Sequence, residues 1–561
     1  MSKERATILD TLPKPVLIGI MLACLLGIYL SQDQLNTQRS QLSPTYIEPL
    51  QDAPPMLALA TETLGGFRGI ISSYLWLRAN EMQLKKNYPE QMQLAKWITQ
   101  IQPQVPAAWV NRSWNLAYNI SRDYEDPETR WKYVYDAVEM IRDEGIKYNP
   151  QEPLVYDQLA YLFEHKIGHN LDDYHRYYKY RWMQSMESVL WESPAAGHAA
   201  KGVPDFDSLI NPDPANTNLV KRVQRLRREY KLDPREMKAV HRKYGLARKL
   251  TFNDQEKKWE LKELKLDEDG QPINCLDWRM PETQSLYWAS LGLKRCSLTP
   301  GREQQLFRLE KKIYVAMMYT FQRGRMNYPS GEKVPDNFLS QFFDNSLMSS
   351  PNLAAAGATH LAYVHMIKLA QESRENHLTG GTSEIGHTHF LRRLIEWLYF
   401  YNREAEAQQW LDLAVELYPV KMTYWPGYNK ETKTYNLKDI VFDKAKDDLE
   451  RGSDSKTQAL LVGVFMKHFF YLAEGEEEKA KGYYEMAEQV HQHYTEKFKN
   501  SQGRMGIGTF EEWRIGRLRA FLMEESPTVT ASLRAKLNLG KDELPENPKP
   551  IGPVPNPGPE R

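Results

Sequence analysis

The chain has 561 residues, of which 41% are hydrophobic and 26% charged, and its basic and acidic side chains cancel to a formal net charge of zero. A chain of this length exceeds what one hydrophobic core can serve, so we expect several packed units or one extended array. Because the charges cancel, there is no bulk attraction for a polyanion, and we expect no nucleic-acid partner.

An uncharged, mostly apolar run extends from Val16 to Leu30, and polar residues follow it directly. The run is short for a membrane span, which usually needs about 17–25 residues. No small-residue cleavage site follows it, so the pattern predicts an uncleaved transmembrane anchor. A cleaved signal peptide and a lipid anchor at Cys24 are the alternatives.

The charges on either side of this run predict an orientation. Lys3, Arg5 and Lys14 precede the run, and only Arg39 follows it before residue 60. The positive-inside bias then predicts a single-pass membrane protein with its N-terminus in the cytoplasm and its body outside, in the periplasmic or extracytoplasmic space. Residues 16–30 would contact the lipid bilayer.

Two cysteines, Cys275 and Cys296, lie in the part of the chain expected to be exported. An oxidising compartment would allow them to pair, and the closed loop would contribute about 3 kcal/mol in the chain-entropy model. Two buried thiols that behave as small apolar residues are the equal alternative.

A proline-containing phrase occurs twice and is the strongest sign of internal repetition. Residues 102–109 read QPQVPAAW, and residues 149–156, which begin 47 positions later, read NPQEPLVY. Each copy ends one apolar-periodic stretch and opens the next with an aromatic residue, Trp109 or Tyr156. Such self-similarity is typical of stacked helical hairpins.

The chain order predicts six regions. Residues 1–31 form a cytoplasmic tip and the anchor, 32–55 a proline-containing linker, and 56–192 a set of helical hairpins. Residues 193–302 form an insertion, 303–540 a second helical array, and 541–561 a proline-rich tail that we expect to be polyproline-like. In the first array, periodicity and prolines predict the helices 57–86, 90–102, 106–121, 128–147, 153–168 and 172–190.

The insertion differs in composition from the arrays around it. Its basic stretch, residues 221–249, carries twelve Lys and Arg against three acidic residues, in what reads as two helices separated near Asp233–Pro234. A small β element is predicted near 259–275, where apolar and polar residues alternate before the turn-forming residues 267–270. The stretch favours anionic lipid, an acidic partner or an anionic cell-wall polymer. The other interpretation is a solvated helix pair whose charge is balanced by acidic residues such as Glu256, Glu260 and Asp267.

The hairpins resemble tetratricopeptide repeats (TPR), and the resemblance covers about half of the chain, residues 65–192 and 383–490. The C-terminal copy has Ala407, Leu411, Ala414 and the terminating Pro419 at the family's spacing. A second copy reads Tyr156, Leu159, Ala160, Phe163, and a third reads Trp109, Ser113, Leu116. Ile395 departs from the pattern because that position usually holds a small residue, and the 47-residue spacing exceeds the usual 34.

This resemblance implies a mostly all-α fold, an alpha-alpha solenoid whose concave face binds other proteins. We therefore expect a membrane-anchored scaffold or adaptor that binds unidentified protein partners in a membrane or envelope assembly. It would have no small-molecule substrate and no cofactor, and no catalytic, cofactor-binding or metal-binding residue is assigned.

The segment 164–175 carries the sharpest alternative, a metal site. His165 and His169 would lie one turn apart on a continuous helix, and Asp172, Asp173 or His175 could complete the ligand set. The competing interpretation is a hairpin turn in which the helix ends near Gly168 and Asp172 caps the next one. The histidines 360 and 365, and 387 and 389, form looser pairs that we interpret as structural.

No nucleophile or phosphate-binding motif supports an enzyme. The chain lacks the G-x-S-x-G, Walker and G-x-G-x-x-G signatures in a suitable context. The alternative function is an exported hydrolase, or a metal-dependent enzyme that uses His165 and His169 on envelope polymers.

Overall fold

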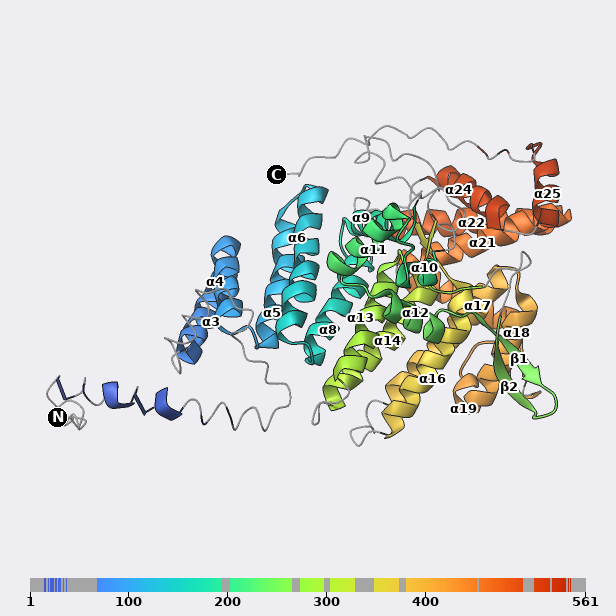
Figure 1. The fold of residues 1–561 in the computed structure, drawn as a ribbon. Helices are drawn as coiled ribbons and strands as arrows, with labels where there is room; N and C mark the ends of the chain where they lie inside the picture. Colours follow the sequence, from blue (N-terminus) through green and yellow to red (C-terminus); the bar gives the residue numbers. More distant parts are fainter. Residues whose placement is uncertain are drawn as a thin grey trace, which may run out of the picture. The chain divides into compact units, whose positions relative to one another are not determined.

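The computed structural model describes the residues 68–192, 202–264, 273–296, 303–327, 348–372, 380–432, 434–451, 454–497, 509–524 and 527–540, with isolated positions at 15–37, 543 and 545. They belong to two compact units, Met1–Gln158 and Leu159–Arg561. Helices dominate both units (Figure 1). The described residues also form three two-stranded antiparallel sheets. The predicted mostly all-α class is therefore confirmed.

The first unit consists of successive helices that break at prolines. Its elements are α3 (Arg68–Leu84), α4 (Tyr88–Ile101), α5 (Pro106–Trp114), η3 (Asn115–Asn119), η4 (Ile120–Asp123), α6 (Pro127–Glu139), η5 (Met140–Gly145), α7 (Ile146–Tyr148) and the first part of α8 (Pro153–Tyr161). Proline occupies the first turn of α4, α5 and α6, where its missing N–H leaves no hydrogen bond unmade. The predicted stretch 57–67 lies outside the described residues, so α3 is described only from Arg68.

The two copies of the proline phrase adopt the same local structure. In the first, the indole N–H of Trp109 donates a hydrogen bond to the carbonyl of Pro103 at 2.7 Å. In the second, the hydroxyl of Tyr156 donates to the carbonyl of Pro150 at 2.8 Å. Both aromatic side chains are buried, and each lies six residues after the proline that it contacts. In each copy, a hydrogen bond from the aromatic residue thus links the proline-containing loop to the helix that follows it.

The second unit continues as helices that pack in sequence. It contains η6 (Leu162–Ile167), α9 (His175–Leu190), α10 (Phe206–Ile210), α11 (Thr217–Arg228), α12 (Pro234–Tyr244), α13 (Pro281–Cys296), α14 (Glu303–Arg323), η8 (Leu353–Ala355), α16 (Ala356–Glu372), α17 (Gly380–Phe400), α18 (Glu404–Leu417), α19 (Pro419–Met422), α20 (Leu437–Arg451), α21 (Asp454–Glu474), α22 (Glu477–Lys497), α24 (Phe510–Glu524) and α25 (Pro527–Lys536). Helix α13 packs against α14, α14 against α16, α16 against α17, and α17 against α18 (Figure 1).

The TPR-like residues of the C-terminal copy lie in the core. Ala407, Leu411 and Ala414 on α18 are fully buried, as is Ile395 on α17. Helices α17 and α18 nevertheless pack closely, so the large side chain at position 395 is accommodated in their interface. Pro419 begins α19 directly after α18 ends.

The sheets are small. Strands β1 (Arg248–Asn253) and β2 (Lys258–Glu263) form one hairpin; β3 (Arg325–Asn327) pairs with β4 (Met348–Ser350), and β5 (Tyr428–Asn429) with β6 (Thr434–Tyr435). The hairpin lies earlier in the chain than predicted, because its turn falls at residues 254–257, where Lys257 adopts a positive φ of 49°. The predicted turn at 267–270 lies outside the described residues. The second basic helix ends at Tyr244, and Arg248 and Lys249 belong to β1.

The predicted transmembrane anchor over residues 16–30 is wrong. Among the residues that the structure describes, every helix is too short or too polar to cross a bilayer. Fifteen helical residues rise only about 22 Å, whereas the hydrocarbon core is about 30 Å thick. The predicted single-pass orientation, with the N-terminus in the cytoplasm and the body outside, depended on this anchor and is therefore not supported either. The predicted linker and tail lie almost wholly outside the described residues.

The two cysteines of the second unit do not pair. Cys275 and Cys296 are both free and buried. The thiol of Cys275 donates to the carbonyl of Tyr244 at 3.1 Å, and burial raises its pKa to about 12. The alternative of two buried thiols is therefore the one that the structure supports.

Candidate anion-binding site

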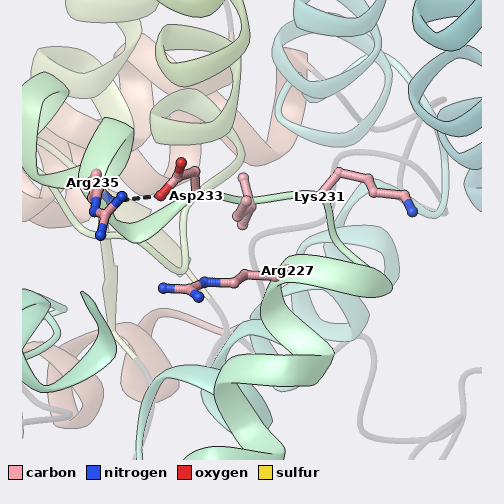
Figure 2. A pocket seen from close by; sticks show the side chains of 5 residues that line it. Arg227, Lys231, Asp233 and Arg235 are labelled. Atoms are coloured by element: carbon pink, nitrogen blue, oxygen red, sulfur yellow. Dashed lines mark hydrogen bonds between the residues drawn. The ribbon is translucent and has the colours of Figure 1, made fainter. Parts of the chain in front are cut away.

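A basic pocket lies where the chain turns from α11 to α12. Its lining consists of Arg227, Lys231, Leu232, Asp233 and Arg235, and its volume is about 310 Å³. Figure 2 shows Arg227 at the end of one helix and Arg235 at the start of the next, with the turn between them. Three cationic side chains and one carboxylate thus share a single hollow.

Local sequence explains the conformation of this turn. Asp233 caps α12 by accepting a hydrogen bond from the backbone N–H of Arg235 at 2.9 Å, and Pro234 occupies the first helical position. The backbone N–H of Asp233 donates to the hydroxyl of Tyr287 on α13 at 3.0 Å. Leu232 is buried and fixes the turn from inside. Lys231, which precedes it, has a positive φ of 54°.

No described acidic side chain forms an ion pair with the cations of the basic pocket. The guanidinium of Arg227 donates to the carbonyl of Ile210 at 3.2 Å, a neutral acceptor. Within the described residues, the side chains of Lys231 and Arg235 enter no ion pair. The only carboxylate in the lining, Asp233, is already engaged in capping α12. The basic pocket therefore keeps an excess of positive charge.

This excess extends along the basic stretch. Across the part of the chain that the structure describes, carboxylates pair with three of its twelve cations: Arg225 with Glu229, Lys238 with Asp207, and Arg248 with Glu263. The balancing residues proposed from sequence do not serve this purpose, because Glu256 and Glu260 both pair with Lys258 of the hairpin. Asp267 lies outside the described residues.

The histidines of the segment 164–175 form a turn, not one ligand cluster. The helix ends at Ile167, and the rings of His165 and His169 stack with centroids 5.7 Å apart. His169 Nδ1 accepts from the backbone N–H of Asn170, and His175 Nδ1 lies 3.0 Å from the ammonium of Lys179.

The predicted carboxylate ligands are occupied elsewhere. Asp172 pairs with Lys166 at 2.6 Å and also accepts from the backbone N–H of Tyr174, whereas Asp173 is exposed. Within the described residues no group of three or more His, Cys, Asp or Glu side chains is arranged to hold a metal ion.

The surroundings of this turn disfavour added positive charge. Burial, with Arg323 and Lys179 nearby, lowers the pKa of His169 to about 3. Burial also holds the pKa of His175 well below its usual value. A divalent cation would have to approach the same ammonium and guanidinium groups, which is electrostatically unfavourable.

Next to this turn, the structure reveals an ionic cluster that sequence reasoning missed. It consists of Glu164, Glu282, Lys312 and Arg323. The guanidinium of Arg323 donates to Glu282 at 2.6 Å and to the backbone carbonyl of Glu164 at 3.0 Å. Lys312 pairs with the Glu164 carboxylate at 3.3 Å. Charges of both signs alternate here, and Glu282 is fully buried.

A π-helical turn makes this cluster feasible. In η6 the N–H of Gly168 donates to the carbonyl of Phe163, five residues back, instead of to Glu164 four residues back. The Glu164 carbonyl is thereby released from the helix and accepts from Arg323. A Cβ at Gly168 would lie 2.9 Å from Glu282 Oε1, so glycine makes room for this carboxylate.

The remaining histidines pair differently from the sequence prediction. His360 and His387 lie on neighbouring helices, with His360 Nδ1 and His387 Nε2 3.0 Å apart. His387 Nδ1 lies 2.7 Å from the hydroxyl of Tyr418. Burial lowers the pKa of His360 to about 4, so both rings are neutral near pH 7. Their interpretation as structural residues is consistent with this geometry.

A last buried group lies farther along the chain. Glu396 on α17 is fully buried, and neither of its carboxylate oxygens has a hydrogen-bond partner among the described residues. Nearby, Arg393 and Lys444 both pair with Asp448. Burial, with Asp448 close by, raises the pKa of Glu396 to about 8, so the side chain is mostly protonated at neutral pH.

Comparison with known proteins gives no family for this chain: no family model matches it, and a search of curated proteins finds no match.

Proposed function

We propose that this protein is a non-catalytic, TPR-like helical scaffold that binds an acidic segment of a partner protein at the basic pocket. The repeated fastening of the loop by Trp109 and Tyr156, and the buried Ala407, Leu411 and Ala414, support the repeat architecture. Arrays of this kind use surface side chains that are not needed for packing to receive peptides.

The observation that carries the proposal is the unmatched charge of the basic pocket. Arg227, Lys231 and Arg235 line the pocket and form no ion pair with a described residue, in contrast to the buried cations of the same unit. Carboxylates of a peptide would supply charge-assisted hydrogen bonds, and arginine presents a planar fork that fits them. A hollow of about 310 Å³ suits one or two acidic side chains.

A direct test uses a labelled peptide rich in Asp and Glu, with a Gln and Asn version of the same length as the neutral control. We expect the full chain to bind the acidic peptide, and the Lys231→Glu/Arg235→Glu variant to bind it at least about tenfold more weakly. Added salt should weaken the parent complex, since exposed charges are screened.

A matched charge reversal controls for net charge. Lys368→Glu/Lys481→Glu changes the total charge by the same amount at two exposed positions on α16 and α22. This variant should bind like the parent. Equal affinity of the parent and Lys231→Glu/Arg235→Glu would overturn the proposal, as would tighter binding of a single-stranded oligonucleotide at the same pocket.

A further inference from the structure

The first unit carries three hydrogen-bonded asparagines, together called the asparagine row: Asn111, Asn115 and Asn119. The side-chain NH2 of Asn119 donates to Oδ1 of Asn115 at 2.6 Å, and the NH2 of Asn115 donates to Oδ1 of Asn111 at 3.1 Å. Asn115 is buried, whereas Asn111 and Asn119 are half-buried. Among the described residues, no side chain bonds the NH2 of Asn111 or Oδ1 of Asn119. The row therefore ends in an open donor at Asn111 and an open acceptor at Asn119.

A pair of aromatic rings lies beside the asparagine row. Trp114 and Tyr118 stack with their centroids 4.3 Å apart and their planes 24° apart. Trp114 is 41% exposed, and Tyr118 is half-buried. Each ring follows an asparagine by three residues, so the rings and the amides share one side of the helix. This side combines neutral amides with an aromatic surface and contains no charged side chain at these positions.

A π-helical turn aligns the two ends of the row. In η3 the backbone N–H of Ile120 donates to the carbonyl of Asn115, five residues back. An α-helix turns about 100° per residue, so residues eight apart would diverge by about 80° around its axis. A π-helix has more residues per turn and brings Asn119 back towards the side that holds Asn111. Such turns are rare and frequently occur at functional sites.

The second copy of the repeat has the same stack but lacks the asparagines. Tyr161 and His165, 47 positions after Trp114 and Tyr118, stack with centroids 4.8 Å apart beside the π-helical η6. There the π turn frees a carbonyl for Arg323. The positions equivalent to the asparagine row hold Gln158, Leu162 and Lys166. The aromatic stack thus belongs to both copies, whereas the asparagine row is an addition that the hairpin does not require.

We infer that the asparagine row binds the backbone of an extended, uncharged segment of a partner polypeptide. A ligand that uses both ends must accept from Asn111 and donate to Asn119. An anion offers no donor and a cation no acceptor, whereas a peptide backbone offers both in almost every residue.

The length of the row fits an extended chain. Its two open groups lie about 12 Å apart, because eight helical residues rise about 1.5 Å each. About four residues of an extended strand, at about 3.3 Å each, span this distance. Between the two ends, the exposed ring of Trp114 offers an apolar contact to a side chain of the segment. The inference goes beyond the basic pocket, which lies in the other unit.

Binding of a labelled peptide to the full chain, measured by fluorescence anisotropy, tests this inference. The probe is an uncharged, end-capped peptide of eight residues that alternates Thr and Val. Its matched ligand has ester links in place of the amides, which removes every backbone N–H and keeps the side chains. We expect the ester version to bind at least about fivefold more weakly, because Asn119 loses its donor.

Two variants assign this preference to the asparagine row. Asn111→Leu/Asn119→Leu should bind the amide and ester versions equally, and Asn111→Asp, which keeps the shape but removes the open donor, should bind the amide peptide at least about threefold more weakly. Both should bind the acidic peptide like the parent, which separates this site from the basic pocket. The control Gln408→Leu/Gln492→Leu removes two helical amides that each donate to a carboxylate four residues ahead, and it should behave like the parent.

Three results would overturn the inference. The first is a parent chain that does not bind the amide peptide, and the second is a parent that binds the amide and ester versions equally. The third is tighter binding of an uncharged oligosaccharide than of the peptide, lost in Asn111→Leu/Asn119→Leu, which would assign the row to a carbohydrate.

Discussion

The basic pocket and the ionic cluster use the same kinds of side chain in opposite ways. In the ionic cluster, Arg323 is buried and its guanidinium is matched by Glu282 and by the released carbonyl of Glu164. In the basic pocket, Lys231 and Arg235 form no ion pair with any residue that the structure describes. Burial forces charges to be matched, because an unpaired ion in the interior is costly, whereas a solvated surface leaves them free to meet a ligand. The paired, buried charges of the ionic cluster therefore stabilise the fold, whereas the cations of the basic pocket are available to a ligand.

The largest effect is expected from breaking the ionic cluster. Arg323→Met leaves Glu282 buried without its cation and should lower the free energy of unfolding by about 3–5 kcal/mol. Denaturant unfolding measures this, and the double variant Glu282→Leu/Arg323→Met should recover much of the loss. The exposed Lys258→Met change in the hairpin is the control and should cost less than about 1 kcal/mol. Equal effects of Arg323→Met and Lys258→Met would remove the distinction between the two regions.

A smaller decrease in the free energy of unfolding is expected at Gly168, the glycine that leaves room for the Glu282 carboxylate. In Gly168→Ala the new Cβ would lie 2.9 Å from both the Glu164 carbonyl and Glu282, and we expect a loss of about 1–3 kcal/mol. Gly482→Ala within α22 is the matched control, because a Cβ there meets no atom within 4 Å. That change should be neutral or stabilise by up to about 1 kcal/mol through helix propensity. A loss no larger at Gly168 than at Gly482 would contradict the close approach of Glu282.

Buried charge should also appear in the dependence of stability on pH. The pKa of Glu396 is raised by burial to about 8 in the folded protein, whereas in the unfolded chain it is close to its ordinary value of 4.5. Between these values the unfolded state binds fewer protons, so this carboxyl's contribution to stability is complete at low pH and is lost as the pH rises through about 8.

The variant Glu396→Gln removes this titration. Its free energy of unfolding, relative to the parent, should therefore increase as the pH rises from about 5 to about 8. Thermal or denaturant unfolding across this range measures the difference. Glu416→Gln, an exposed carboxyl on α18, serves as the control and should follow the parent at every pH. A constant difference between Glu396→Gln and the parent would show that Glu396 is ionised when folded.

The smallest effect on stability is expected at the basic pocket. Lys231→Met/Arg235→Met should change the free energy of unfolding by no more than about 0.5 kcal/mol per site, because no ion pair is lost. The same variant should bind the acidic peptide measurably more weakly. A loss of stability comparable to that of Arg323→Met would show that these cations hold the fold instead of serving a ligand.

The sequence predicts the helices well because their periodicity and proline boundaries are local. Pro106 and Pro153 open α5 and α8 as expected, and Trp109 and Tyr156 are buried in equivalent settings. Arg323 and Glu282 are 41 residues apart, and only tertiary packing brings them together. A sequence pattern can suggest neither this pair nor the π-helical turn that accommodates it.

The histidines show why proximity in the sequence misleads. His360 and His365 are five positions apart on one helix, and His387 and His389 are two apart, so neither pair shares a helix face. The actual neighbours, His360 and His387, lie on different helices. The metal hypothesis for His165 and His169 assumed a continuous α-helix, but the π-helical turn and the end of the helix at Ile167 place the later ligands elsewhere. The membrane prediction relied on a run of uncharged residues that is too short to span as a helix.

Hydrogen–deuterium exchange of the full chain, with and without the acidic peptide, tests the central claim most directly. We predict that bound peptide slows exchange in the segment 216–244, which forms α11, the turn and α12, and that Lys231→Glu/Arg235→Glu abolishes this protection. Protection that lies elsewhere in the described residues, or that persists in the variant, would contradict a scaffold that receives its partner at the basic pocket.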